Sequence, residues 1–212
     1  MTDLEVEYIL SYVPMAKFKL DLNFDHIEKD ILTMAKSVEG VRKSNVGGWQ
    51  SDNFSMHKHY GPFNSIIENY INPAMQDYSK TMGLSGKVIL NNYWINVNYR
   101  NNFNMMHTHP GAFLSGVFYI KCPENSGNIE FMNSEYDLID AYAHANPSAH
   151  NWWKNDKNNF SFFFEKSHIL EVESGVCYLF PAWKNHIVQP NNTDEPRISI
   201  AFNYNIDFGA KT

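Results

Sequence analysis

The sequence contains little cysteine, no surplus of positive charge and no long apolar run. Its two cysteines, Cys122 and Cys177, are too few for a disulfide framework and too far apart for a zinc ribbon or a redox CxxC motif. Such sparse cysteine is typical of a reducing compartment, so we expect a cytoplasmic protein.

The charge and the hydrophobic pattern exclude further classes. A formal net charge of −6 leaves no excess of lysine and arginine to neutralise a phosphate backbone, which argues against nucleic acid as a partner. Residues 1–20 carry acidic side chains where a signal peptide would be basic, and their apolar residues are interrupted too often to span a membrane. What the chain does contain is 43% hydrophobic and 15% aromatic residues, which is ample for a packed core in 212 residues.

The apolar pattern divides the chain into a helical part, residues 1–86, and a strand-rich part, residues 87–206. Residues 23–40 predict an amphipathic helix with Asn23 as its N-cap, and residues 62–83 predict a second helical segment, kinked or divided at Pro73. From Lys87 onward, about seven or eight short runs of Val, Ile, Tyr and Phe are separated by Gly, Asn and Pro. These predicted strands lie within residues 87–100, 112–122, 127–133, 168–174, 175–182, 186–190 and 197–206.

Strands that follow helices in this order predict a mainly β jelly roll with the N-terminal helices packed on one face. We expect a single domain over residues 1–212. One segment, residues 136–164, does not follow the strand rhythm, and long irregular segments inside compact domains are usually lids or binding loops. Its Trp152 and Trp153 could cap a pocket or simply anchor the loop to the core.

Four residues form a candidate metal and anion site. The stretch "NNFNMMHTHPGAFLSGVFYI" places His107 and His109 one residue apart, so that on extended backbone both rings lie on one face and could grip a metal. His186 follows a distant strand and completes a facial triad of the kind that non-haem iron uses to keep coordination positions open. Arg197 begins the last strand, and its planar fork suits the carboxylate of a ligand that chelates the metal at its other end.

Each of these side chains also has an ordinary structural explanation. A single histidine is more often structural than metal-binding, and Arg197 could pair with Glu195 at the surface. A second pair, His57 and His59, has the same spacing but no downstream partner, which favours a solvated loop pair.

Taken in order, HxH, "SGVFYI", "GVCYLFPAWKNH" and "RISIAFN" resemble motifs of the iron(II)- and 2-oxoglutarate-dependent oxygenases. The similarity is greatest to a largely uncharacterised branch with bacterial and phage members, and it covers roughly residues 47–206, including "GGWQS". It implies a double-stranded β-helix with the catalytic iron(II) at His107, His109 and His186. It also implies 2-oxoglutarate with its distal carboxylate on Arg197 and, by similarity to the prolyl-hydroxylase branch, Tyr119 as a further donor, with Ser199 as a second one. Tyr119 could equally be core packing.

The chain departs from the usual His-x-Asp pattern, because His109 stands at the acidic position. Three neutral imidazoles give the iron site one negative charge fewer than two histidines and a carboxylate do. This favours the binding of an anionic co-substrate. The resemblance implies a hydroxylase that couples decarboxylation of 2-oxoglutarate with O2 to oxidation of an unidentified primary substrate. Candidates for the substrate rim are Trp49, Tyr99, Arg100, Trp183 and residues 136–164.

Two other functions remain open at the level of the sequence. A cupin-type dioxygenase would use three histidines without 2-oxoglutarate and would leave Arg197 without a cofactor to bind. A non-catalytic jelly-roll binding module would contain these histidines incidentally.

Overall fold

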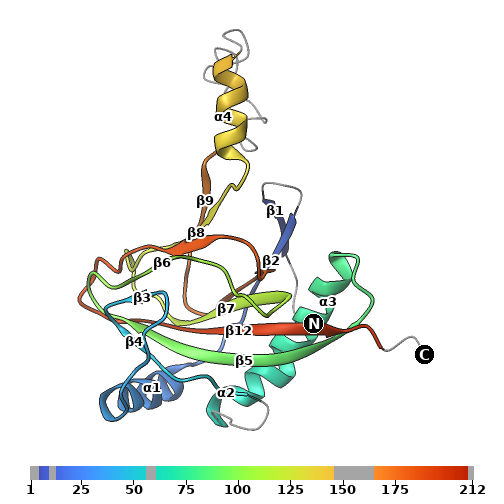
Figure 1. The fold of residues 1–212 in the computed structure, drawn as a ribbon. Helices are drawn as coiled ribbons and strands as arrows, with labels where there is room; N and C mark the ends of the chain where they lie inside the picture. Colours follow the sequence, from blue (N-terminus) through green and yellow to red (C-terminus); the bar gives the residue numbers. More distant parts are fainter. Residues whose placement is uncertain (1–4, 10–12, 56–60, 146–164, 210–212) are drawn as a thin grey trace.

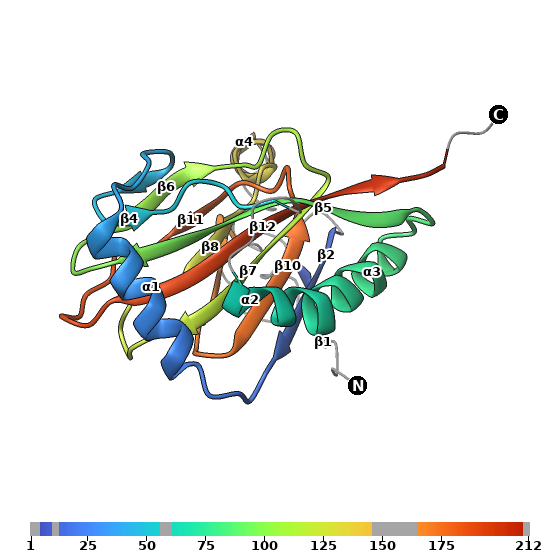
Figure 2. The ribbon, with the colours of Figure 1, turned by 90° about the horizontal axis from the view of Figure 1, so that it is seen from below.

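Two antiparallel β-sheets face each other, and helices cover the outer face of the larger sheet (Figure 1). The computed structural model describes residues 5–9, 13–55, 61–145 and 165–209. Seen from below, α1, α2 and α3 lie across the larger sheet, with the smaller sheet behind it (Figure 2). The prediction of a mainly β jelly roll with helices on one face is therefore confirmed.

The chain passes back and forth between the sheets from β5 to β8 and again from β10 to β12. In spatial order, the larger sheet consists of β1 (Glu5–Ile9), β2 (Val13–Lys19), β10 (Val176–Pro181), β7 (Leu114–Lys121), β12 (Arg197–Asp207), β5 (Lys87–Asn98) and β4 (Trp49–Gln50). The smaller sheet consists of β3 (Asn45–Val46), β6 (Phe103–His107), β11 (His186–Val188), β8 (Ile129–Met132) and β9 (Ser167–Leu170).

All seven predicted strand segments form strands, but the expectation that residues 1–86 are helical was wrong for β1 to β4. The hairpin of β1 and β2 extends the larger sheet beyond β10, with Ala16 paired to Leu179. The alternation of apolar and polar residues in this hairpin is short, and β10, with which β2 pairs, lies far along the chain. The local sequence pattern alone therefore did not predict these strands. Strand β6 was also missed, because its sequence FNMMH is too polar to stand out as a buried strand.

The helical layer follows the prediction, except that the N-cap of the first helix is Phe24 and not Asn23. Helix α1 (Asp25–Ser37) begins two residues after Asn23, whose Oδ1 accepts a hydrogen bond from the Asp25 amide at 2.8 Å. The second segment is divided into α2 (Gly61–Ile66), a π-helical turn η1 (Ile67–Ile71) and α3 (Asn72–Thr81). The division lies directly before Pro73, which lacks the amide hydrogen that an uninterrupted helix requires.

The segment predicted to be irregular begins with a helix, α4 (Tyr136–Ala145), which extends away from the two sheets in Figure 1. Residues 146–164, with Trp152 and Trp153, lie outside the described residues, as does the pair His57 and His59. Over the part of the chain that the structure describes, no helix combines the length and the apolar character needed to cross a bilayer.

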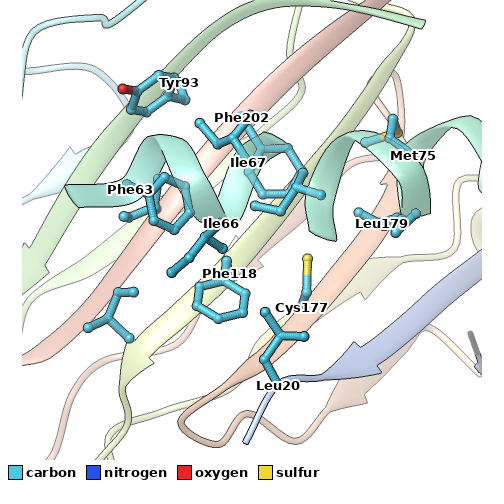
Figure 3. Packing of buried hydrophobic residues seen from close by; sticks show 14 of the residues in the cluster. Leu20, Phe63, Ile66, Ile67, Met75, Tyr93, Phe118, Cys177, Leu179 and Phe202 are labelled. Carbon is cyan, nitrogen blue, oxygen red and sulfur yellow. The ribbon is translucent and has the colours of Figure 1, made fainter. Parts of the chain in front are cut away.

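The main hydrophobic core fills the space between the helices and the larger sheet. Figure 3 shows Phe63 and Ile67 of the helical layer packed over Phe118 and Phe202 of the sheet. The rings of Phe63 and Phe118 lie 5.9 Å apart, and burial of each such ring contributes roughly 1.5–3 kcal/mol.

This core also determines what faces the space between the sheets. On β12, Ile198, Ile200 and Phe202 belong to the core. Because side chains alternate along a strand, the opposite face presents Arg197, Ser199, Ala201 and Asn203 to the smaller sheet.

Close packing at Gly116 in β7 gives a test of this arrangement. A Cβ there would lie 2.6 Å from Cζ of Phe202 and 2.7 Å from the backbone oxygen of Tyr178, and the sheet backbone cannot retreat. Gly116→Ala should therefore lower the free energy of unfolding by about 1–3 kcal/mol, measured by urea denaturation. The control is Gly61→Ala, because no heavy atom lies within 4 Å of a Cβ there; its stability should stay the same or rise by up to about 1 kcal/mol. Equal stability of both variants would contradict the packing.

Candidate metal centre

Three histidines converge between the two sheets. His107 ends β6 and His186 begins β11, and the two residues are paired directly across these strands. His109 joins them, so that one potential ligand atom from each residue lies within 4.8 Å of the other two. The ring centroids of His107 and His186 lie 4.3 Å apart, and that of His109 lies 5.1 Å from His186.

The way the chain brings His107 and His109 together differs from the expectation. They do not share one strand, because β6 ends at His107 and β7 begins only at Leu114. Instead, the His109 amide donates a hydrogen bond to the Ala182 carbonyl at 2.8 Å, which ties this turn to the segment before His186. A β-bulge before His107, where three steps along β6 match two along β11, lets both Asn104 and His107 line the cavity.

The hydrogen bonds of the rings indicate which nitrogens are free. Nδ1 of His107 lies 2.7 Å from the Met105 carbonyl oxygen, and Nδ1 of His186 lies 2.9 Å from that of Lys184. A carbonyl only accepts, so both Nδ1 atoms carry the proton and both Nε2 atoms keep a lone pair. Nδ1 of His109 lies 2.8 Å from Oδ1 of Asn203, and its buried Nε2 has no hydrogen-bond partner. Three imidazole nitrogens within 4.8 Å of one another, each with a lone pair, fit a divalent transition metal.

Burial keeps the three imidazoles neutral. Desolvation lowers the pKa of His109 to about 4, against a raising effect of its hydrogen bond to Asn203. Desolvation likewise lowers the pKa of His107, and it lowers that of His186 far below the usual range. Neutral imidazole is the form that binds a metal. In the described ranges, no carboxylate belongs to this cluster.

Arg197 is fully buried and is only partly satisfied. Its Nη1 donates to the backbone oxygens of Ser126, Gly127 and Gln189, at 2.5, 3.0 and 3.1 Å. Its Nε and Nη2 have no hydrogen-bond partner. The surface pair with Glu195 does not form, because Glu195 lies 3.0 Å from Lys121 instead. Burial lowers the pKa of Arg197, but a guanidinium stays protonated, so two donors of a buried cation are available for an anion.

Polar side chains form a row between the histidines and Arg197. Ser199 on β12 is paired with Tyr119 on β7 and, on its other side, with Asn96 on β5. The Tyr119 hydroxyl and Oδ1 of Asn96 are buried without hydrogen-bond partners. Burial raises the pKa of Tyr119, so its hydroxyl stays protonated and can donate. The ring of Tyr119 also packs in a core cluster, so packing and an available donor coexist in one side chain.

A cavity between the sheets extends from the three histidines to Tyr119 and Ser199, and Arg197 lies two positions from Ser199 on the same face of β12. A strand rises roughly 3.3 Å per residue, which places Ser199 about 7 Å along β12 from Arg197, on the way to the histidines. The cavity therefore has metal-binding nitrogens at one end and anion-binding donors toward the other. Its lining includes Asn96, Asn104, His107, His109, Val117, Tyr119, Ile129, Phe180, His186, Val188 and Ser199.

Of the four single residues expected at the substrate rim, Trp183 lies in the segment that leads to His186, whereas residues 146–164 of the predicted rim loop lie outside the described residues. Trp183 is 51% exposed, follows Ala182 and packs edge-on against Phe113 at 5.4 Å. The assignment of Trp49 was wrong. Trp49 is buried in the main core, with its Nε1 donating to the Val38 carbonyl. Tyr99 and Arg100 lie in the turn between β5 and β6, at the opposite end of β6 from His107.

Sequence reasoning missed three residues of the site: Asn96, Ser115 and Asn203. Ser115 and Asn203 contact Nδ1 of His109 directly or through each other, and Asn96 lines the cavity. A signal for Asn203 was present, because Arg197, Ser199 and Asn203 follow the period of two that puts them on one face of a strand. Ser115 likewise lies on the face of β7 that carries Tyr119, whereas Asn96 had no predicted site residue on its own strand.

Comparison with known proteins gives a family. A family model described as "Putative 2OG-Fe(II) oxygenase" matches residues 92–203, just over half of the chain. The matched range contains His107, His109, His186 and Arg197. No curated protein sequence matches the chain.

Solved structures share the fold. A Pseudomonas putida prolyl-4-hydroxylase aligns with a TM-score of 0.59 and 11% identity over 91% of this chain and 92% of that one. The non-haem α-ketoglutarate-dependent carbocyclase SnoK, from nogalamycin biosynthesis, aligns with a TM-score of 0.60 and 10% identity over 90% and 78%. HygX from Streptomyces hygroscopicus, with nickel and 2-oxoglutarate bound, aligns with a TM-score of 0.51 and 11% identity over 92% and 83%. At these identities the likeness concerns the fold.

The buried histidines should make the metal-free protein sensitive to acid. Folding lowers the pKa of His109 from 6.5 to about 4, so as the pH falls the unfolded chain takes up this proton first. The stabilisation is complete above the unfolded pKa and is lost as the pH falls toward the folded one. When the pH is lowered from about 7.5 to about 5, the free energy of unfolding should fall by roughly 2 kcal/mol because of His109 alone. Denaturation of the wild type and of His109→Gln at both pH values, without metal, measures the difference, and equal losses in both proteins would contradict a buried neutral His109.

Proposed function

The chain belongs to the 2OG-Fe(II) oxygenase family, and we propose that its three converging histidines hold the iron(II) while Arg197 holds the distal carboxylate of 2-oxoglutarate. The observation that carries this assignment is the guanidinium of Arg197, which is 0% exposed and keeps two donors without partners. A buried charge of this kind is costly unless an anion accompanies it. A dicarboxylate that also reaches the metal supplies that anion.

The protein is an iron(II)- and 2-oxoglutarate-dependent oxygenase, with 2-oxoglutarate and O2 as co-substrates. When bound, the iron supplies O2 activation coupled to decarboxylation of 2-oxoglutarate, and we infer that hydroxylation of a primary substrate is the outcome. The chain itself binds, orients and desolvates the reactants.

The side chains divide this work between them. The Tyr119 hydroxyl donates to the same distal carboxylate as Arg197, and Ser199 adds a second hydroxyl from the next position on that face of β12. Asn96 stands opposite Ser199, where its amide can complete the polar wall around the co-substrate.

Apolar side chains keep the metal end of the cavity dry. Phe180 and Phe131 pack against the His186 ring, with centroids 4.9 and 5.4 Å away. Val117, Ile129 and Val188 line the cavity beside them. Exclusion of water strengthens the charge interactions that hold the co-substrate.

The absence of a carboxylate from the histidine cluster in the described residues is compatible with this function. Three neutral ligands leave the full dipositive charge of iron(II) to be balanced by bound anions, and 2-oxoglutarate carries two negative charges. A cupin-type dioxygenase without 2-oxoglutarate would leave the buried guanidinium of Arg197 uncompensated, so the geometry favours the 2-oxoglutarate enzyme. HygX, which shares this fold, holds nickel and 2-oxoglutarate in its solved structure, and this supports the proposal.

An anaerobic titration with iron(II) and then 2-oxoglutarate tests the assignment. The wild type should develop the visible charge-transfer band of a chelated 2-oxo acid. Arg197→Met keeps the length of the side chain but removes the charge and both free donors, so the Kd for 2-oxoglutarate should rise at least about 100-fold. Tyr119→Phe removes one neutral donor and should raise it about tenfold.

The matched control is Arg100→Met, because Arg100 lies near the same end of β12 as Arg197 but is exposed and pairs with Asp194, so its removal deletes a positive charge without deleting a buried donor. Its affinity for 2-oxoglutarate should be that of the wild type. Iron binding by the wild type without the band would reject 2-oxoglutarate as co-substrate, and a normal band with Arg197→Met would reject the anchor.

A further inference from the structure

His109 differs from the other two histidines in what holds its ring. His107 and His186 each bond through Nδ1 to the carbonyl of the residue two positions earlier in their own chain segment. His109 lies outside any strand, and its Nδ1 meets side chains instead, Oδ1 of Asn203 at 2.8 Å and Oγ of Ser115 at 2.5 Å. Ser115 and Asn203 are paired directly across β7 and β12, so the larger sheet positions this ring.

The two side chains together determine the tautomer of His109. The Ser115 hydroxyl has a single proton, and it lies 3.0 Å from the Phe202 carbonyl and 3.0 Å from Oδ1 of Asn203, both of which accept. Its oxygen lone pairs, and Oδ1 of Asn203, are then available to accept from Nδ1–H of His109. With the proton on Nδ1, the buried Nε2 keeps its lone pair for the metal.

The opposite arrangement shows why Asn203 matters. If the amide were turned by half a rotation, its NH2 group would donate to Nδ1 and favour the proton on Nε2, which would then lack the lone pair that a metal ligand needs. A carboxylate at position 109 would have no such tautomer to fix. Replacement of the usual acidic ligand by histidine therefore creates a need for a hydrogen-bond acceptor behind the ring.

We propose that Asn203 and Ser115 are positioning residues that hold His109 as a neutral metal ligand, an inference that rests on the proposed iron site. They act through His109 and touch neither the metal nor the co-substrate. Hydrogen-bond partners behind a ligating histidine typically change metal affinity by 10–100-fold.

Cobalt(II) affinity of the full-length, metal-free protein tests the proposal without catalysis. Asn203→Leu removes the acceptor at nearly constant volume and should weaken cobalt(II) binding by about 10–100-fold. Asn203→Asp can only accept, so it should bind within about threefold of the wild type or more tightly. Ser115→Ala removes the second acceptor and should weaken binding by up to about tenfold. The control is Asn205→Leu, because Asn205 is exposed on the same strand β12; it should bind like the wild type.

Nitrogen-15 NMR of histidine-labelled, metal-free protein gives the second readout, because the ring nitrogen shifts report the tautomer. His109, assigned with His109→Gln, should carry its proton on Nδ1 in the wild type and in Asn203→Asp. It should show a larger fraction of the Nε2–H form in Asn203→Leu, where Oγ of Ser115 is the remaining acceptor. A role in packing alone would not change the tautomer. Circular dichroism confirms that each variant is folded.

The outcomes separate this proposal from the proposed function. If the wild type binds cobalt(II) and Asn203→Leu binds it equally well with an unchanged tautomer, the positioning role is overturned and the iron site stands. If folded Asn203→Asp loses the metal as Asn203→Leu does, the acceptor role is overturned. A wild type that binds neither cobalt(II) nor iron(II) overturns both.

Discussion

A charged guanidinium buried without a complete set of partners is the constraint on which the site depends. Three backbone carbonyls satisfy only one nitrogen of Arg197, and they come from the turn that contains Ser126 and Gly127 and from the segment after β11. A buried guanidinium with two nitrogens left without partners is costly, and an anionic ligand that accepts from them offsets part of this cost.

The histidine end of the cavity carries no charge of its own. The three histidines proposed as ligands are neutral, so a metal ion held there would keep its full charge in the same low-dielectric region as Arg197. A dianion between these two positive centres would lower the electrostatic cost of both. In the proposed site, metal and co-substrate therefore bind as one electrostatic unit, and the protein supplies one fixed positive charge and the shape of the space.

From the sequence, the residue types of the site were easier to predict than their arrangement in space. The order of His107, His186 and Arg197 and the apolar strands around them are local signals, and they were sufficient to predict the jelly roll and the family. The β1–β2 hairpin and the bulge in β6 depend on pairing with strands far along the chain, which no local pattern contains. For the same reason the contacts of Asn203 and Ser115 with His109 became visible only when the register between β7 and β12 was known.

The contrast between backbone and side-chain partners behind the rings has an evolutionary consequence. The carbonyls of Met105 and Lys184 remain whatever side chains those positions acquire, so the orientation of His107 and His186 is buffered against sequence drift. The orientation of His109 is instead encoded in two other side chains, which makes positions 109, 115 and 203 a linked set. A change between histidine and a carboxylate at position 109 is thus a step that frees, or recruits, residues on two other segments of the chain.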